Sequence, residues 1–283
     1  MNDLMIKMSL IGSSSSLGLN WIYDRELMKE FSEKNKVLFL PIQHKLYEKA
    51  EHGFDVYPNH QIGDLDFMGE VAYLFHTYLK DNIDIDLKQY VYNNIGPTST
   101  YDGYIEKYGK VLIDEINNGS QSTSLEDTQL IGPTMYIIGY AHGLTDNDIL
   151  HFTKVFTIYE DNHKFHKTLN YLFKNLEKGN KKKTLAESIS FLPSQYQESC
   201  KIALTEIELF KFIDDYSGVA CGLEQSFPLV YYIVSHSNTF VEALVLNSSL
   251  GGASSARGIL IGAIYSLLEN MPRKYESILN KAL

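Results

Sequence analysis

The sequence predicts an all-α domain, and three features favour this class. Apolar residues recur at helical spacing along most of the 283-residue chain, whereas the alternation typical of a half-buried strand is almost absent. The chain is 44% hydrophobic and contains 20 Tyr, 14 Phe and a single Trp, which is ample material for a core. Gly-Pro and X-Pro pairs separate the helical stretches, as expected for loops and helix starts. We therefore expect one all-α domain over residues 1–283, with about ten to twelve helices.

Seven segments carry the helical pattern most clearly. In the first of them the apolar side chains at 68, 71, 72, 75 and 79 fall on one side of a 3.6-residue helix. The predicted helices cover residues 64–80, 104–116, 149–159, 163–176, 202–213, 240–246 and 256–268.

Two short segments are less helical in pattern. Residues 36–40, Lys-Val-Leu-Phe-Leu, would pass for a strand, although a helix end fits them equally well. Residues 179–183, Gly-Asn-Lys-Lys-Lys, are polar, and we expect a surface loop there in preference to a linker between domains. We expect neither an internal repeat nor a second domain.

Composition and missing motifs exclude several classes of function. The 25 Lys and Arg against 35 Asp and Glu give a formal charge of −10, which argues against a general nucleic-acid binder. Cys200 and Cys221 are the two cysteines, without CxxC spacing, and the nine His form no HExxH pattern, so a disulfide scaffold and a zinc site are disfavoured. The chain contains no GxGxxG, Walker or GxSxG motif.

The sequence also bears on location. No apolar run approaches the roughly 20 residues that cross a bilayer, and the start of the chain has no basic segment followed by an apolar one. We therefore expect a cytoplasmic protein without membrane or nucleic-acid partners. Export by a route without a cleaved signal, for example into a host cell, stays open.

Three carboxylates lie close together at Asp64, Asp66 and Glu70. If the helix begins near Asp64, that residue is its N-cap, and Asp66 and Glu70 are neighbours on the face opposite the apolar stripe. The structural interpretation is a capped, solvent-facing helix end. The catalytic interpretation places this acidic face in a cleft, where one carboxylate acts as a general base toward water. Position in the sequence does not decide between the two.

Residues 251–258 read Gly-Gly-Ala-Ser-Ser-Ala-Arg-Gly, and almost all of them are small. Gly258, Gly262 and Ser266 follow at intervals of four, so they predict a close approach to another helix. Packing alone does not account for the two glycines and two serines at the amino end. Those residues suit a helix N-terminus whose free N–H groups and hydroxyls meet an anion or a sugar.

Five motifs follow one another in a characteristic order. They are Ser-Leu-Gly-Leu-Asn-Trp-Ile-Tyr-Asp at 16–24, Gly-Asp at 63–64, Tyr-Asp-Gly-Tyr-Ile at 101–105, Cys-Gly-Leu-Glu-Gln-Ser-Phe-Pro at 221–228, and the 251–258 segment. In this order the chain resembles the ADP-ribosylglycohydrolase superfamily, which includes the dinitrogenase-reductase-activating glycohydrolases. Within it, the chain is similar to the branch with a Gly-Ala-His-Trp-Ile-Tyr-Asp-like motif. The resemblance spans nearly the whole chain and is strongest in the first and last motifs.

The resemblance implies a single-domain orthogonal helical bundle that cleaves the glycosidic bond between ADP-ribose and a protein side chain or small acceptor. The family typically holds two Mg²⁺ through a Thr-Asp-Asp near the second helix and an Asp-x-Asp-Thr after the C-terminal Gly-Gly. By position these fall here on Gly69, Glu70 and Val71 and on Ala253, Ser255 and Ala256, and an early Asp is replaced by Ser13. Hard cations need several oxygen ligands. We therefore expect a protein with no metal and no other cofactor.

Two functions follow from the resemblance. The first is removal of mono-ADP-ribose from a modified protein, with the arginine linkage favoured and with Asp64, Asp66 and Glu70 as the catalytic carboxylates in place of a metal pair. The second is a catalytically inactive relative that binds ADP-ribose or has a structural, crystallin-like role. The expected partner is ADP-ribose or an ADP-ribosylated protein.

The expected substrate-binding residues come from several motifs. The diphosphate fits N–H groups of residues 126–129 or of the 251–252 turn, and a tyrosine at 101, 104 or 159 would stack on the adenine. We expect residues 13–24, 63–70, 101–105 and 251–258 to converge on one cleft. The full set is Ser13, Asn20, Tyr101, Tyr104, Asp127, Thr128, Gln129, Gly251, Gly252, Ser254 and Ser255.

Overall fold

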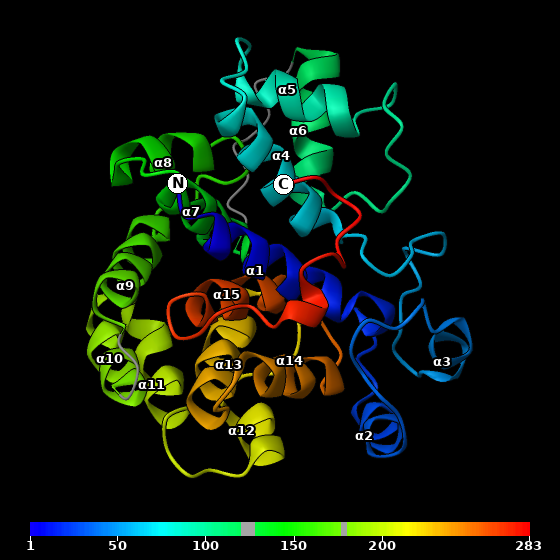
Figure 1. Ribbon diagram of the computed structural model, residues 1–283, viewed down its shortest axis with the longest axis vertical. Helices are drawn as coiled ribbons and strands as arrows, with labels where there is room; N and C mark the ends of the chain where they lie inside the picture. Colours follow the sequence, from blue (N-terminus) through cyan, green and yellow to red (C-terminus); the bar gives the residue numbers. More distant parts are fainter. Residues whose placement is uncertain (120–127, 177–179) are drawn as a thin grey trace.

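The computed structural model describes residues 1–119, 128–176 and 180–283 and is built of helices (Figure 1). Within these residues no β-strand occurs, and the strand-like pairings are two isolated bridges, Ile22 with Gly53 and Gln129 with Gly222. The all-α prediction is therefore confirmed. The described residues contain fifteen α-helices, more than the ten to twelve expected, because many of the helices are short.

The first half of the chain begins with a long buried helix and continues through shorter ones. These elements are α1 (Asp3–Ser15), the 3-10 turn η1 (Leu17–Leu19), α2 (Arg25–Lys34), α3 (His44–Lys49), α4 (Phe67–Lys80), α5 (Leu87–Ile95), α6 (Lys107–Asn118), α7 (Ile131–Ala141) and α8 (Asp146–Thr153).

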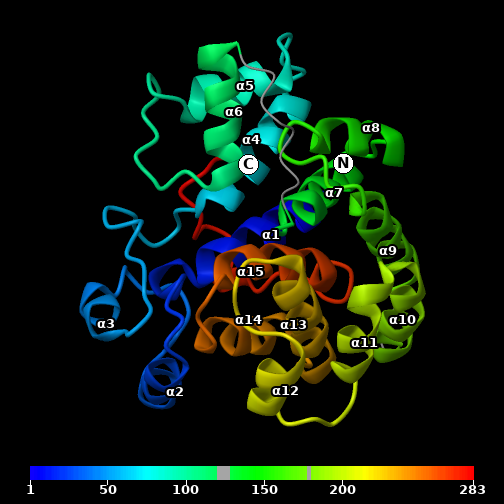
Figure 2. The ribbon, with the colours of Figure 1, turned by 180° about the vertical axis from the view of Figure 1, so that it is seen from behind.

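The second half returns to the centre of the molecule with its last α-helix (Figure 2). Its elements are α9 (Asn162–Asn175), α10 (Lys181–Ser188), η2 (Ile189–Phe191), α11 (Ser194–Ile202), α12 (Leu209–Tyr216), α13 (Leu223–His236), α14 (Phe240–Ser249), α15 (Ser254–Tyr265) and η3 (Arg273–Tyr275).

Helices α1 and α15 lie side by side at the centre, with α4 to α8 on one side of the pair (Figures 1 and 2). Their backbones touch at glycines. A Cβ on Gly12 would lie 2.0 Å from the carbonyl oxygen of Gly258, and a Cβ on Gly262 would lie 2.1 Å from that of Met8. The predicted close approach at Gly258 and Gly262 is thus confirmed, and a larger residue there would force the two helices apart.

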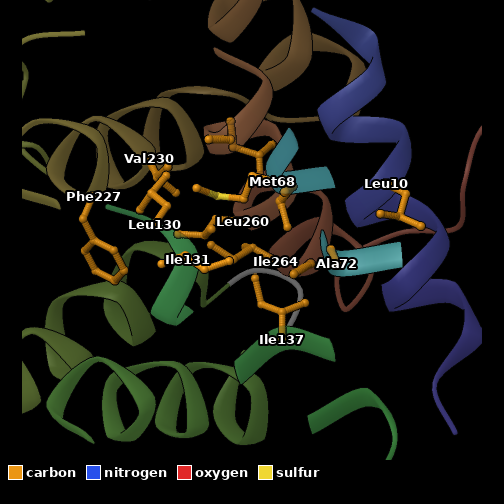
Figure 3. Packing of buried hydrophobic residues seen from close by; sticks show 14 of the residues in the cluster. Leu10, Met68, Ala72, Leu130, Ile131, Ile137, Phe227, Val230, Leu260 and Ile264 are labelled. Atoms are coloured by element: carbon orange, nitrogen blue, oxygen red, sulfur yellow. The ribbon is translucent and has the colours of Figure 1, made fainter. Parts of the chain in front are cut away.

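One hydrophobic cluster runs through the described residues and joins helices from both halves of the chain. Figure 3 shows five of its members, each from a different helix: Leu10 of α1, Met68 of α4, Ile137 of α7, Val230 of α13 and Leu260 of α15. Each of these side chains is at most 1% exposed. Burial of this kind is the main stabilising term of the fold, and it fixes α4 and α15 relative to α1.

Several predicted helices have different limits in the structure. Helix α4 begins at Phe67 because Asp66, and not Asp64, is its N-cap. The single helix expected over 202–213 is wrong, since α11 ends at Ile202 and the Glu208 carboxylate accepts the first amide N–H groups of the separate helix α12. The helix expected over 149–159 ends at Thr153, where the chain turns.

Two further expectations need correction. Residues 36–40 form neither a strand nor a helix end, and Phe39 within them has a φ of 53°. Residues 181–183, expected in a loop, form the first turn of α10, whereas Gly179 lies outside the described residues. A search of the described helices finds none long and apolar enough to cross a membrane.

Candidate functional site

Asp66 stands where α1 and α4 meet. As N-cap of α4 it uses Oδ1 to accept the amide N–H of Gly69 at 2.9 Å, and the same oxygen accepts the hydroxyl of Ser13 at 2.8 Å. Gly69 leaves the room for this arrangement, because a Cβ on it would lie 2.7 Å from Ser13 Oγ. Asp66 is 2% exposed. The sequence thus places a deeply buried carboxyl group at the start of a central helix.

Burial raises the pKa of Asp66 to about 6, while the hydrogen bonds from Gly69 and Ser13 act in the opposite direction by favouring the ionised form. At neutral pH the group is therefore mostly ionised, yet it takes up a proton more readily than an ordinary aspartate does. A pKa close to the working pH is the property that makes a carboxylate an efficient general base.

Hydroxyl and amide groups gather at the N-terminus of α15. Ser254 and Ser255 are completely buried, and Asn20 Oδ1 accepts the amide N–H of Ser255 at 3.1 Å. Within the described part of the chain, the two serine Oγ atoms and Asn20 Nδ2 have no hydrogen-bond partner, and the same holds for the hydroxyls of Ser14 and Ser16. Because buried polar groups are almost always paired, these atoms need partners, which bound water or a ligand rich in hydroxyl groups would supply.

The Gly251-Gly252 turn before α15 is held rigidly. Gly251 and Gly252 have φ values of 60° and 58°, and their N–H groups donate to the carbonyl oxygens of Ser248 and Ile22. The fully buried Arg257 donates to the carbonyl oxygen of Gly251 at 2.6 Å. The expectation that these two N–H groups meet a diphosphate therefore does not hold, since both are already used. The glycines shape the turn instead.

The other proposed diphosphate segment is only partly described. Asp127 and the preceding Glu126 lie outside the described residues. The carbonyl oxygen of Thr128 accepts the amide N–H of Leu223 at 2.7 Å, and Gln129 forms an antiparallel bridge with Gly222. Thr128 and Gln129 therefore lie next to the start of α13, beside the 221–228 motif.

Aromatic side chains connect three of the motifs. The ring of Trp21, whose φ of 69° is unusual for a bulky residue, lies 5.2 Å from that of Tyr104. Tyr101 donates its hydroxyl to the Tyr104 carbonyl oxygen at 3.0 Å, and its ring lies 6.0 Å from that of Phe67. The backbone amide N–H of Trp21 also donates to the carbonyl oxygen of Gly252 at 2.7 Å. Residues 13–24, 63–70, 101–105 and 251–258 thus form one connected group.

A second acidic group lies in a cleft of about 510 Å³ beside α4. Asp64, Glu70 and Asp102 supply its carboxylates, and we refer to it as the carboxylate cleft. Glu70 Oε1 pairs with Lys281 Nζ at 2.8 Å. Burial raises the pKa of Glu70, and the Lys281 ammonium opposes that rise. The other lining residues are Asn59, His60, Gln61, Tyr73, Leu74, Asn94, Ile95, Thr100 and Tyr101.

The structure therefore divides the three predicted catalytic carboxylates between two surroundings. Asp66 joins Ser13 in the first of them, and we refer to these two residues together with the buried Asn20, Ser254 and Ser255 as the buried group. Asp64 and Glu70 line the carboxylate cleft. Asp64 accepts the amide N–H of Gln61 at 2.7 Å. Sequence reasoning missed Lys281, because it belongs to none of the motifs and lies far from Glu70 in the chain.

The residues of the buried group do not suit a pair of divalent cations. Asp66 is the one carboxylate among Ser13, Asp66, Asn20, Ser254 and Ser255, and Glu70 already has an ammonium partner. Hard cations such as Mg²⁺ prefer several oxygen ligands, usually with more than one carboxylate. Across the described ranges no three His, Cys, Asp or Glu side chains form a cluster that could hold a metal ion.

Comparison with known proteins found no protein-family model that matches this chain and no curated protein that matches its sequence. The chemistry of the site itself therefore carries the functional argument. It combines a buried carboxylate with a raised pKa, unpartnered hydroxyls at a helix N-terminus, and aromatic rings in the connecting motif.

Proposed function

We propose that this protein is an ADP-ribosyl hydrolase that removes mono-ADP-ribose from arginine side chains of a modified protein. The observation that carries the proposal is Asp66, a buried carboxyl group with a pKa of about 6 beside the Ser13 hydroxyl of α1. The order of motifs that resembles the ADP-ribosylglycohydrolases supports the same substrate class. The unpartnered hydroxyls of Ser254 and Ser255 support a sugar ligand.

In this proposal Asp66 is the general base. One carboxylate oxygen, Oδ1, holds the N–H of Gly69 and the hydroxyl of Ser13. We assign the other oxygen, Oδ2, the role of accepting a proton from the attacking water. The water oxygen bonds to the anomeric carbon of the distal ribose while the bond from that carbon to the guanidine nitrogen breaks. Asp66 takes one proton from the attacking water and afterwards returns it to solvent, while the departing guanidine nitrogen takes up one proton from solvent, so protons and charges balance.

Asn20, Ser254 and Ser255 bind and orient the ribose. Their free hydroxyl and amide groups can exchange hydrogen bonds with the ribose 2- and 3-hydroxyls, which holds the anomeric carbon in position. The positive N-terminal ends of α4 and α15 lie at this group and attract the negatively charged parts of the substrate. Tyr101 or Tyr104 stacks on the adenine.

Release of free ADP-ribose from a panel of Arg-, Ser- and Asp/Glu-modified proteins tests the proposal. We expect turnover on the arginine-linked substrate, with little on the others. No release from any of them, together with calorimetric binding of ADP-ribose, would favour the inactive binder. Absence of both release and binding would contradict the whole substrate class.

A further inference from the structure

The last eight residues, 276–283, cross back over α4 after η3, and we call them the C-terminal strap. Figures 1 and 2 show the red end of the chain, which contains this segment, running up to α4. Just before the strap, Tyr275 is buried and its ring lies 4.8 Å from that of Phe39. The strap therefore begins at a fixed point and reaches the carboxylate cleft.

The loop before α4 is shaped to receive the strap. The amide N–H of Asn280 donates to the carbonyl oxygen of Gly63 at 3.0 Å, and its side-chain Nδ2 donates to Asp64 Oδ1 at 2.9 Å. Gly63 has a φ of +99°, and a Cβ there would lie 2.2 Å from the carbonyl oxygen of Ile278. A side chain at position 63 would thus exclude the strap.

Lys281 places its ammonium group between an acid and an aromatic ring. Its Nζ lies 2.8 Å from Glu70 Oε1 and 5.2 Å from the centre of the Tyr73 ring. The Tyr73 hydroxyl donates to the carbonyl oxygen of Ala282 at 3.3 Å. A carboxylate combined with an aromatic face is how proteins bind ammonium and guanidinium groups. Lys281 thus shows directly which kind of group this place accepts.

The charge of the cleft fits a cation better than an anion. Lys281 is the one Lys or Arg among the described lining residues, against the carboxylates of Asp64, Glu70 and Asp102. Burial lowers the pKa of His60 and so favours the neutral form of this ring. The cleft keeps a volume of about 510 Å³ with Lys281 in place, which leaves room for a second side chain to enter.

Another cation can take the place of Lys281 at Glu70. The Lys281 side chain is 31% exposed, and ion pairs with a solvent-accessible partner contribute little net stability. The other contacts between the strap and α4 or the loop before it do not involve Lys281: Asn280 donates to the Gly63 carbonyl oxygen and to the Asp64 carboxylate, and the Tyr73 hydroxyl donates to the Ala282 carbonyl oxygen. An incoming cation can therefore replace Lys281 at Glu70 without disturbing the core.

We propose that the carboxylate cleft binds a lysine or arginine side chain of a partner protein and that Lys281 occupies this place as an internal stand-in until the partner displaces it. The inference goes beyond the proposed function, because binding here requires no hydrolysis. If the partner is the modified protein, the side chain bound in the cleft is a second one, outside the ADP-ribosyl linkage.

The test is a titration of the protein with N-acetyl-arginine amide, in which NMR measures the binding affinity. N-acetyl-citrulline amide, the uncharged isostere, is titrated in the same way. Lys281→Ala should bind the arginine compound at least tenfold more tightly than the wild type, and the citrulline compound should bind neither. Lys274→Ala is the matched control, since Lys274 is an exposed lysine near the strap with its Nζ over the Tyr275 ring. This variant should bind as the wild type does.

Adding Glu70→Gln to Lys281→Ala should abolish the gain, because the ligand then loses its carboxylate partner. Equal affinity of the wild type and Lys281→Ala, or a gain that survives Glu70→Gln, would overturn the inference. Thermal denaturation of each variant checks folding, and Lys281→Gln, which keeps most of the aliphatic stem, replaces Lys281→Ala if the latter is unfolded. Because the titration uses no ADP-ribosyl substrate, failure of the hydrolase proposal would leave its result unchanged.

Discussion

Asp66 and Glu70 belong to the same end of one helix, yet their surroundings differ. Both carboxyl groups are buried, at 2% and 7% exposure, and burial raises the pKa of each. Asp66 has neutral partners, the Ser13 hydroxyl and the Gly69 amide, whereas Glu70 has the Lys281 ammonium. A carboxylate without a counter-charge is ready to accept a proton, and a carboxylate with one is suited to hold a cation. Four positions on a helix thus separate a candidate base from a candidate binding group.

The largest expected difference between the two groups is in turnover. Asp66→Asn should lower kcat for release of ADP-ribose by about 10²–10⁴-fold, because the amide cannot accept the proton from water. Glu70→Gln should change kcat by less than about tenfold, because Glu70 is not the general base in this proposal. Steady-state kinetics on an arginine-modified protein measures both. Equal losses of kcat in the two variants would contradict the assignment of Asp66, and not Glu70, as the base.

Asp66→Asn should at the same time stabilise the protein at neutral pH. The rise of the Asp66 pKa from 3.8 to about 6 means that the folded state binds the proton more tightly than the unfolded state. Ionised Asp66 therefore costs up to roughly 3 kcal/mol of stability above pH 6, and this cost vanishes below about pH 4, where both states are protonated. Asn keeps an oxygen for Ser13 and Gly69.

Urea denaturation at pH 8 and at pH 4 tests this effect. We expect a gain in the free energy of unfolding for Asp66→Asn at pH 8 and almost none at pH 4. A variant that is less stable than the wild type at both values would show that Asp66 is stabilised by interactions beyond those described here.

Removing the Lys281 side chain should lower the free energy of unfolding, by less than Asp66→Asn raises it. Lys281→Ala leaves Glu70 buried without its counter-charge, but the lysine is partly exposed, so the loss should be about 1 kcal/mol at neutral pH and not the 3–5 kcal/mol of a fully buried pair. The loss should shrink at acid pH, where Glu70 is protonated. Chemical denaturation as a function of pH measures it. A pH-independent loss would indicate that the aliphatic stem, not the charge, stabilises the strap.

The smallest effect concerns a hydroxyl at the start of α15. Ser255→Ala should weaken binding of ADP-ribose by roughly fivefold, the usual size of one neutral hydrogen bond, and leave kcat nearly unchanged. Ser266→Ala is a matched control at the other end of the helix, since its hydroxyl donates to the carbonyl oxygen of Ala263. Calorimetric titration with ADP-ribose measures the affinity of both variants, and Ser266→Ala should bind as the wild type does. Similar affinities would remove Ser255 from the binding residues.

The sequence predicted best what depends on local spacing. Helical periodicity indicated the all-α class, and the four-residue spacing of Gly258 and Gly262 indicated the contact that α15 makes with α1. The start of α4 was missed by a few residues, because Asp64 and Asp66 are equally good N-cap residues and only the contact with Ser13 distinguishes them.

Contacts between distant segments could not be predicted in this way. Nothing in the pattern near Glu70 indicates that Lys281 pairs with it, because the pairing depends on how the strap crosses α4. The break between α11 and α12 was also hidden, since the apolar spacing continues across it while the Glu208 carboxylate caps a new helix. The predicted site residues came from motifs, and their division into a buried group and a cleft required the fold.

The central claim, that Asp66 is the base of an ADP-ribosyl hydrolase, is tested most directly by the pH dependence of kcat on an arginine-modified protein. Below about pH 6 the wild-type rate should fall close to tenfold for each pH unit, because Asp66 becomes protonated and can no longer accept the proton from water. The residual rate of Asp66→Asn should show no such fall. A wild-type rate that stays constant through pH 6, or a fall that persists in Asp66→Asn, would contradict the claim.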